Sequence, residues 1–414
     1  MSQNSVKKNM FSQYLLQFAK YVFPLITVPY LTRVLGPDVY AIRAYIMAFM
    51  TFVQVFLDFG FNARGTKVIA ENRKDKEAVC KETSIIVVLR FMLFGLGALA
   101  TFVITPFIPL MAANALYVLI AYIRTALKSS LPDFVFQGYE DMGIITHRFV
   151  VSEAVGVGLI FLLVKGPEQI LLVPLIEAIV TFIASIWSWY DVIVVRDIRW
   201  RVFTHDEAKE AFKHSSIFFF SSAATTIYSS LTTLMIGIEI SDPAIISYWS
   251  LSVTAIGAIQ SLYTPITNSI YPHLIVTKEF SLLKKLLKIG IPVCLIGTIA
   301  FYNLADVVFS ILGGSEYLSG VYVLQTLTPI LFTSFIGMMV GFPVLVPMNE
   351  EKHLTMSSVI AAIFHIVGLV ALSYMGVFTI VSVAILRNAT EIVMTGFRLK
   401  YSWPYLFGIK ETSN

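Results

Sequence analysis

Long apolar runs recur along the whole chain and leave only short polar stretches between them. A helix that crosses a membrane needs about 20 mainly apolar residues. Runs of roughly this length are expected at residues 11–35, 40–61, 83–104, 111–131, 149–164, 169–194, 215–238, 244–270, 289–312, 321–346, 355–374 and 378–397. Only 14% of the 414 residues are charged, whereas soluble domains carry about 25%. The sequence therefore predicts an all-α polytopic membrane protein with twelve transmembrane helices.

Lysine and arginine are distributed unevenly between alternate breaks. The N-terminal segment, every second break after it and the C-terminal tail are basic. The loops between them, taken as residues 34–40, 105–110, 166–168, 239–243, 313–320 and 375–377, contain no Lys or Arg. Basic residues concentrate in the short cytoplasmic loops of membrane proteins. This pattern predicts a multi-pass protein with both termini in the cytoplasm.

The twelve runs divide into two sets of six that share landmarks. A basic segment precedes the first and seventh runs, and a turn with Pro and Asp follows each of them, at residues 37–38 and 242–243. An even number of helices in each half is typical of parallel repeats. We expect an N-terminal lobe of residues 1–203, whose linker begins near residue 195, and a C-terminal lobe of residues 204–414.

The polar stretch between the two predicted lobes has the pattern of a helix start. Thr204 followed by Glu207 fits a capping box, in which each side chain accepts a hydrogen bond from the backbone of the other residue. We expect a short interfacial helix here.

Ionisable residues inside the apolar runs carry the most information, because each costs about 2.5–3.5 kcal/mol at a helix centre. Gln17, Lys20 and Thr27 lie at helical spacing in the first run and predict a polar face. Arg90 and Arg124 lie about 10 Å inside the third and fourth runs from the cytoplasmic end. Together these residues predict a cationic cavity suited to a phosphate or another anion.

The two arginines also have a simpler interpretation. They could pair with Asp58, with Glu153 or with carbonyl groups at helix ends, or they could extend to lipid headgroups. The sequence does not choose between this structural role and an anion site.

Seven residues are candidates for gating or ion coupling: Asp58, Glu153 and the five that follow. Glu177 and Asp306 are expected toward the outer side, where either could carry coupling protons. His365 could be a proton-linked switch, although a hydrogen-bonded buried histidine is the commoner case. Arg33 and Arg43 bracket the outer turn and could form an outer gate or contact headgroups.

The sequence lacks the motifs of several classes of enzyme. The sequence contains no GxxxxGK[ST], HExxH or GxSxG pattern. Cys80 and Cys294 are far apart and show no metal-ligand spacing. We therefore expect a secondary transporter and not an enzyme, with no metal, no cofactor and no nucleic-acid partner.

Three segments carry a resemblance to a known family. PLITVPYLTRVLGPDVY, DFGFNARGTKVIAENR and LPDFVFQGYEDM resemble the Wzx-type polysaccharide flippases of the multidrug/oligosaccharidyl-lipid/polysaccharide exporter (MOP) superfamily. The resemblance is strongest over residues 9–150. It implies a MATE-like, V-shaped fold of two six-helix lobes around a cationic central cavity.

The resemblance also implies a function. Such a flippase moves undecaprenyl-diphosphate-linked oligosaccharides to the outer leaflet of the bacterial inner membrane by alternating access, coupled to a gradient of H⁺ or Na⁺. The implied partners are the lipid-linked oligosaccharide, membrane lipids, a polysaccharide polymerase and chain-length proteins. Two alternatives stay open: an antiporter of organic cations, which would need carboxylates in the cavity, and a non-transporting scaffold for glycan assembly.

Overall fold

The computed structural model describes residues 3–240 and 242–407, and these residues form helices and no strands. They belong to two compact units, Met1–Thr226 (unit 1) and Ile227–Asn414 (unit 2), which divide within one long helix, α9. The lobes predicted with a boundary at residue 203 remain a prediction. Each unit is described below by itself.

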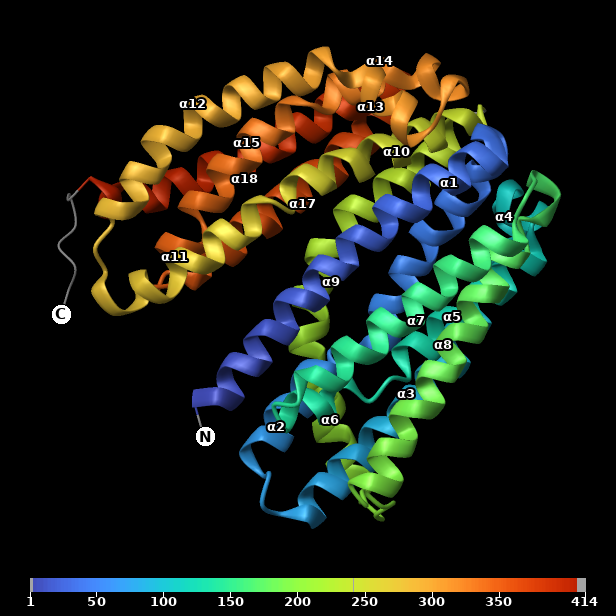
Figure 1. Cartoon of the computed structure of the whole chain (residues 1–414), viewed down its shortest axis with the longest axis vertical. Helices are drawn as coiled ribbons and strands as arrows, with labels where there is room; N and C mark the ends of the chain where they lie inside the picture. The colour runs from blue at the N-terminus through green and yellow to red at the C-terminus, as the bar shows by residue number, and fades with distance from the viewer. Residues whose placement is uncertain (1–2, 241, 408–414) are drawn as a thin grey trace. The chain divides into compact units, whose positions relative to one another are not determined.

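Unit 1 holds the helices that build the candidate site. Its elements are α1 (Gln3–Asp58), α2 (Phe61–Glu71), α3 (Lys76–Ile104), η1 (Thr105–Phe107), α4 (Pro109–Ala113), α5 (Ala115–Ser129), α6 (Asp133–Gly138), α7 (Met142–Leu163), η2 (Pro167–Gln169), α8 (Leu172–Tyr190), η3 (Asp191–Val195) and the first part of α9 (His205–Glu239). In Figure 1, α5 and α7 run side by side with α1, and α8 runs beside α5 and α7. Stacked rings of Tyr30 and Phe161, with centroids 4.0 Å apart, join α1 to α7.

Unit 2 contains two bent helix pairs. Its elements after α9 are α10 (Pro243–Gln260), α11 (Tyr263–Thr277), α12 (Ser281–Asn303), α13 (Ala305–Leu312), η4 (Ser315–Gly320), α14 (Val321–Leu327), α15 (Pro329–Val340), α16 (Phe342–Leu345), α17 (Glu351–Tyr374) and α18 (Ile380–Leu406). The helix axis bends by 65° between α12 and α13, and by 40° near Pro329.

The described residues include seven helices that are long and apolar enough to cross a membrane, or nine if each of two bent pairs counts as one span. The first of them, Phe11–Glu71, has 61 residues. At 1.5 Å per residue it would measure about 90 Å, three times the hydrocarbon core, so it must contain more than one crossing. The protein is a multi-span membrane protein, and the count of twelve spans remains a prediction.

The two straight segments of α1 each end at a glycine-containing sequence. The expected turn lies at Gly36, whose φ of 71° and ψ of 169° interrupt the helical geometry of α1. The second break follows Asp58, where Phe59 and Gly60 adopt φ values of 38° and 76°. Only glycine adopts such a conformation without a steric penalty, which explains the glycine of the Asp58-Phe59-Gly60 sequence.

The capping box at the start of α9 is confirmed. The backbone N–H of Thr204 donates to Glu207 Oε2 at 2.7 Å, and the N–H of Glu207 donates to Thr204 Oγ1 at 3.3 Å. The expected short helix is wrong, however, because α9 continues to Glu239. No Gly or Pro occurs between His205 and Ile236 to break it.

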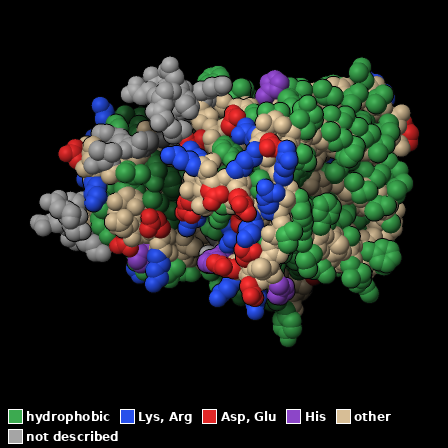
Figure 2. Space-filling model, turned by 90° about the horizontal axis from the view of Figure 1, so that it is seen from below, with side chains coloured by type: hydrophobic (Ala, Val, Ile, Leu, Met, Phe, Trp, Pro, Cys, Tyr) green, Lys and Arg blue, Asp and Glu red, His purple; other side chains and the backbone are tan. Residues whose placement is uncertain are grey.

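Charged side chains gather at the end of unit 1 that holds the start of α3 and residues 196–207. Figure 2, which looks at the molecule from this end, shows many Lys, Arg, Asp and Glu side chains beside a broad hydrophobic surface. Lys76 Nζ lies 2.6 Å from Asp197 Oδ2. Hydrogen bonds from Lys76 and then from Arg199 lower the pKa of the Asp197 carboxyl below its ordinary value of 3.8.

Candidate functional site

Unit 1 encloses a cavity of about 640 Å³. Side chains of α1, α2, α5, α6, α7 and α8 line it. This volume lies in the range of about 300–1,000 Å³ that is usual for small-molecule sites. The cavity is the main candidate site because seven of the fourteen Asp, Glu, His, Lys and Arg residues of the apolar runs line it.

The cavity contains both signs of charge. Its basic residues are Lys20, Arg43, Arg124, Lys128 and Arg148. Its acidic residues are Asp58, Asp133, Glu153 and Glu177. Five basic and four acidic residues make its charge less one-sided than the sequence suggested.

Glu177 of α8 bridges two arginines across the cavity. Its Oε1 lies 2.8 Å from Arg43 Nη2 on α1, and its Oε2 lies 2.9 Å from Arg124 Nε on α5. The side chains of the three residues are only 14–18% exposed. Charges that are partly shielded from water interact more strongly than charges on a surface. The bridge therefore ties three helices together at the cavity wall.

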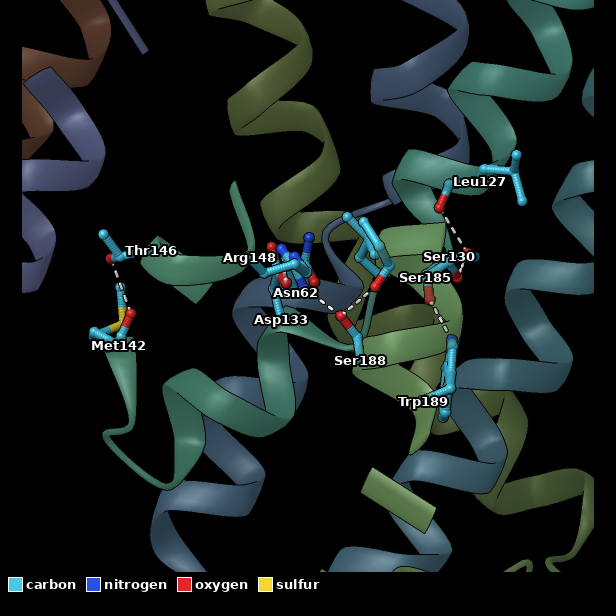
Figure 3. Close-up of polar contacts among 12 residues, drawn as sticks. Asn62, Leu127, Ser130, Asp133, Met142, Thr146, Arg148, Ser185, Ser188 and Trp189 are labelled. Carbon is cyan, nitrogen blue, oxygen red and sulfur yellow. Dashed lines mark hydrogen bonds and ion pairs between the residues drawn. The ribbon is translucent and has the colours of Figure 1, made fainter. Parts of the chain in front are cut away.

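A second buried ion pair lies where α6, α7 and α8 meet. Arg148 Nη2 is 2.8 Å from Asp133 Oδ1, and Arg148 Nη1 donates to Ser188 Oγ at 2.9 Å. Figure 3 shows these three side chains together, with Asn62 next to them. The pair fixes the start of the short helix α6 against α7.

The end of α5 is held to α8 by polar contacts that Figure 3 also draws. Ser130 Oγ lies 3.2 Å from Ser185 Oγ, and the indole N–H of Trp189 donates to the Ser130 carbonyl at 3.1 Å. These contacts position the last turn of α5, which carries Lys128 into the cavity.

Two lysines of the cavity differ from its arginines. Among the described residues, Lys20 and Lys128 have no carboxylate within 4.0 Å, although both line the cavity. The same holds for the carboxylates of Asp58 and Glu153, which have no Lys or Arg nitrogen within that distance. These four residues are the charged groups of the cavity that a ligand could engage without first breaking an ion pair.

The structure brings part of the predicted anion site together. Lys20, Thr27 and Arg124 line the cavity, and Thr27 donates its hydroxyl to the Phe23 carbonyl at 2.8 Å. Gln17 is exposed and lies outside the cavity lining.

Arg90 occupies a different place from the one expected. It is 2% exposed and does not line the cavity. Its Nη1 donates to the Leu131 carbonyl at 3.0 Å and its Nη2 to Asn62 Oδ1 at 2.9 Å. These contacts match the alternative interpretation, in which the arginine satisfies a carbonyl just beyond a helix end. Arg90 therefore anchors the connection between α5 and α6.

The gate and coupling candidates are scattered. Arg43 and Glu177 meet in the cavity. The expected position of Glu177 toward the outer side remains a prediction. Arg33 is exposed on α1 outside the cavity lining, and Asp306 is exposed in the first turn of α13.

His365 of unit 2 is fully buried between two threonines. Its Nε2 and Nδ1 each lie 2.8 Å from a hydroxyl, those of Thr232 and Thr390. Thr390 Oγ1 also donates to the Leu386 carbonyl, so it accepts from Nδ1–H. This arrangement is that of a hydrogen-bonded core histidine.

Sequence reasoning did not single out Lys128, which lies within the predicted run 111–131, or Arg148, which lies in the basic break that follows it. A signal for Lys128 was present, because residues four apart on a helix share a face and Lys128 follows Arg124 by four positions. Arg148 had no comparable signal, since its partners come from two other helices.

A second cavity, of about 440 Å³, lies in unit 2 between α10, α11, α12 and α15. Its walls are mainly apolar, and none of the described residues that line it is charged. The ionic chemistry therefore belongs to the cavity of unit 1.

Comparison with known proteins identifies the family. Residues 6–278, about two thirds of the chain, match the family of polysaccharide biosynthesis proteins. The chain belongs to this family. It is 25% identical over 405 residues to a proposed O-antigen transporter of Escherichia coli (strain K12), with 96% of each chain covered. It is 27% identical over 385 residues to a proposed O-antigen transporter of Shigella dysenteriae, covering 89% of this chain and 93% of the relative.

Solved structures agree on the fold. An inward-facing multidrug resistance MATE family transporter of the MOP superfamily superposes with a TM-score of 0.70 at 15% identity, covering 95% of this chain and 96% of the other. A MOP superfamily transporter from Pyrococcus furiosus, described as having a binding pocket of reverse polarity, gives a TM-score of 0.53 at 14% identity, with 98% and 94% covered. These likenesses confirm the predicted MATE-like fold.

Proposed function

We propose that this polysaccharide-family membrane protein is a flippase for undecaprenyl-diphosphate-linked oligosaccharides. Its relatives are described as O-antigen transporters, and its fold is that of MATE transporters. The observation that carries the proposal is the presence of two cavity lysines, Lys20 and Lys128, that have no carboxylate within 4.0 Å among the described residues.

A lipid diphosphate fits this chemistry. An ammonium group in the membrane interior is costly unless a counter-charge is present. A diphosphate supplies several acceptor oxygens and at least two negative charges, enough for both lysines. Lys128 also lies one helical turn from Arg124, so the same ligand could reach an arginine.

Transport would proceed by alternating access, from the inner to the outer leaflet of the bacterial inner membrane, with both termini cytoplasmic. Asp58 and Glu153 are the best candidates for coupling to H⁺ or Na⁺, because they line the cavity without an ion pair among the described residues. The product would be the repeat unit of a surface polysaccharide, and the flippase would work with a polymerase and chain-length proteins.

The test replaces both lysines. Lys20→Gln/Lys128→Gln should reduce export of a fluorescent lipid-linked oligosaccharide at least tenfold in proteoliposomes, and surface polysaccharide should be lost from a host without its own flippase. Lys67→Gln/Lys285→Gln is the matched control, because both of these lysines are exposed and lie outside the cavity. Normal export by the cavity variant, at a normal amount of protein in the membrane, would refute the site.

The four cavity carboxylates are the one observation that favours the antiporter alternative, since organic cations need such groups. The same proteoliposomes separate the alternatives. A flippase moves the lipid-linked oligosaccharide and not a fluorescent organic cation, an antiporter does the reverse, and a scaffold moves neither.

A further inference from the structure

The Glu177 bridge has the geometry of an occupied anion site. One carboxylate lies between two guanidinium groups and gives one oxygen to each. Arg43 contacts Glu177 through Nη2, whereas Arg124 contacts it through Nε alone. The contact of Arg124 with Glu177 is an ion pair by distance, without hydrogen-bond geometry. Among the described residues, Arg124 donates no hydrogen bond, and its side chain lines the cavity. Its two terminal nitrogens are therefore available to a ligand.

Phosphate and carboxylate oxygens compete for the same donors. A planar guanidinium binds either group with two parallel N–H bonds. Arg43 and Arg124 together carry two positive charges, and Glu177 cancels one of them. A diphosphate with two or more negative charges would match the pair better than Glu177 does, but it could not occupy both arginines while the carboxylate stays between them.

We propose that Glu177 is a tethered competitor, which occupies an anion site formed by Arg43 and Arg124 until the diphosphate group of the substrate displaces it. This inference rests on the proposed function, because it assigns the site to the diphosphate of a lipid carrier. It also assigns Glu177 a task in release: when the carboxylate returns to the arginines, it expels the diphosphate. Glu177 thus lowers affinity and favours turnover.

The surroundings of Glu177 fit this exchange. Lys128 follows Arg124 on the same face of α5 and can guide an anion to the pair. Glu153 of α7 lines the same cavity without an ion pair among the described residues, so it adds negative charge but blocks no donor. This difference between two carboxylates of one cavity provides the control for the experiment.

The first experiment measures binding of inorganic pyrophosphate to the purified full chain in nanodiscs by calorimetry. Glu177→Gln should bind pyrophosphate at least tenfold more tightly than wild type. Glu153→Gln removes the same charge from the same cavity and should gain less than threefold. Adding Arg124→Gln to Glu177→Gln should return the affinity to the wild-type value or below. Equal gains for the two glutamine variants, or no gain for Glu177→Gln, would overturn the inference.

A second measurement, of the thermal midpoint with and without pyrophosphate, separates a change in binding from a folding defect. Glu177→Gln leaves two partly buried arginines without their counter-charge, so its thermal midpoint should fall. Pyrophosphate should then raise the Tm of Glu177→Gln more than it raises that of wild type, because the ligand replaces the missing carboxylate. An equal or smaller rise would contradict the competitor role.

Failure of this inference can be distinguished from failure of the proposed function. If wild type fails to move lipid-linked oligosaccharides while Glu177→Gln gains pyrophosphate affinity, the function falls and the anion site remains. If wild type moves them and Glu177→Gln gains nothing, the inference alone falls.

Discussion

Replacing Gly60 by alanine should destabilise the protein severely, because two independent penalties coincide at this residue. Its φ of 76° lies in the left-handed region, which costs an L-residue about 1–2 kcal/mol. A Cβ at this position would also lie 2.5 Å from the Ser215 carbonyl oxygen, 2.6 Å from Phe218 Cβ and 3.0 Å from the Phe219 backbone nitrogen. Overpacking of this kind costs about 1–3 kcal/mol.

The total expected for Gly60→Ala is about 2–5 kcal/mol. Two of the three atoms that a Cβ would meet belong to the backbone of α9, so they cannot rotate away. The turn after α1 would have to move away from α9, and relief at one position would strain its neighbours.

Gly376 provides a matched control. Its φ is 67°, but no atom lies within 4 Å of the Cβ it would receive. Gly376→Ala should therefore cost only the backbone penalty of about 1–2 kcal/mol. The free energy of unfolding of both variants is measured in mixed micelles. Equal losses, within about 0.5 kcal/mol, would show that the contact between the turn and α9 is not as close as described.

Three further predictions address the site and its surroundings. Asp133→Asn should lower the free energy of unfolding by about 3–5 kcal/mol, and Arg148→Met should lower it less, because the guanidinium is the more buried partner (5% against 24% exposed). The same unfolding assay measures both variants, and a larger loss for Arg148→Met would contradict the prediction. His365→Leu should lower stability by about 1–3 kcal/mol through lost hydrogen bonds and keep export per folded molecule; export lost at full stability would instead assign His365 to coupling. Because the pKa of Asp197 is lowered in the folded protein, its ionised carboxylate stabilises the fold at pH values above the unfolded pKa of 3.8, and this stabilisation is lost as the pH falls through the lower folded pKa. Asp197→Asn should therefore reduce the decline of Tm below about pH 5. An unchanged dependence of Tm on pH in acid would count against the ion pairs.

The helical membrane class and the family could be predicted from the sequence because both depend on local patterns. The breaks at Gly36 and after Asp58 and the cap at Thr204 follow from backbone chemistry within a few residues. Local patterns gave the wrong length for the helix that begins after Thr204. Its polar composition suggested a short helix, but no helix-breaking residue ends it, and α9 continues to Glu239.

The candidate site could be predicted only in part. Helical spacing placed Lys20 and Thr27 on the face that lines the cavity, and depth along the helix drew attention to Arg124. The same reasoning gave Arg90 equal weight, although its donors satisfy the Leu131 carbonyl and Asn62. Depth and spacing do not reveal whether a charged side chain already has a partner.

The sequence by itself determined that the chain crosses a membrane many times, where its first helix breaks, and that cations lie within its N-terminal half. Only the tertiary structure decided which of these cations are paired. Glu177 meets Arg43 across 134 positions of sequence, and it meets Arg124 as well, while Lys20 and Lys128 line the same cavity without a carboxylate within 4.0 Å among the described residues. The physical reason is that a helical period fixes the face on which a charge lies, whereas the packing of α1, α5 and α8 fixes the charge that faces it.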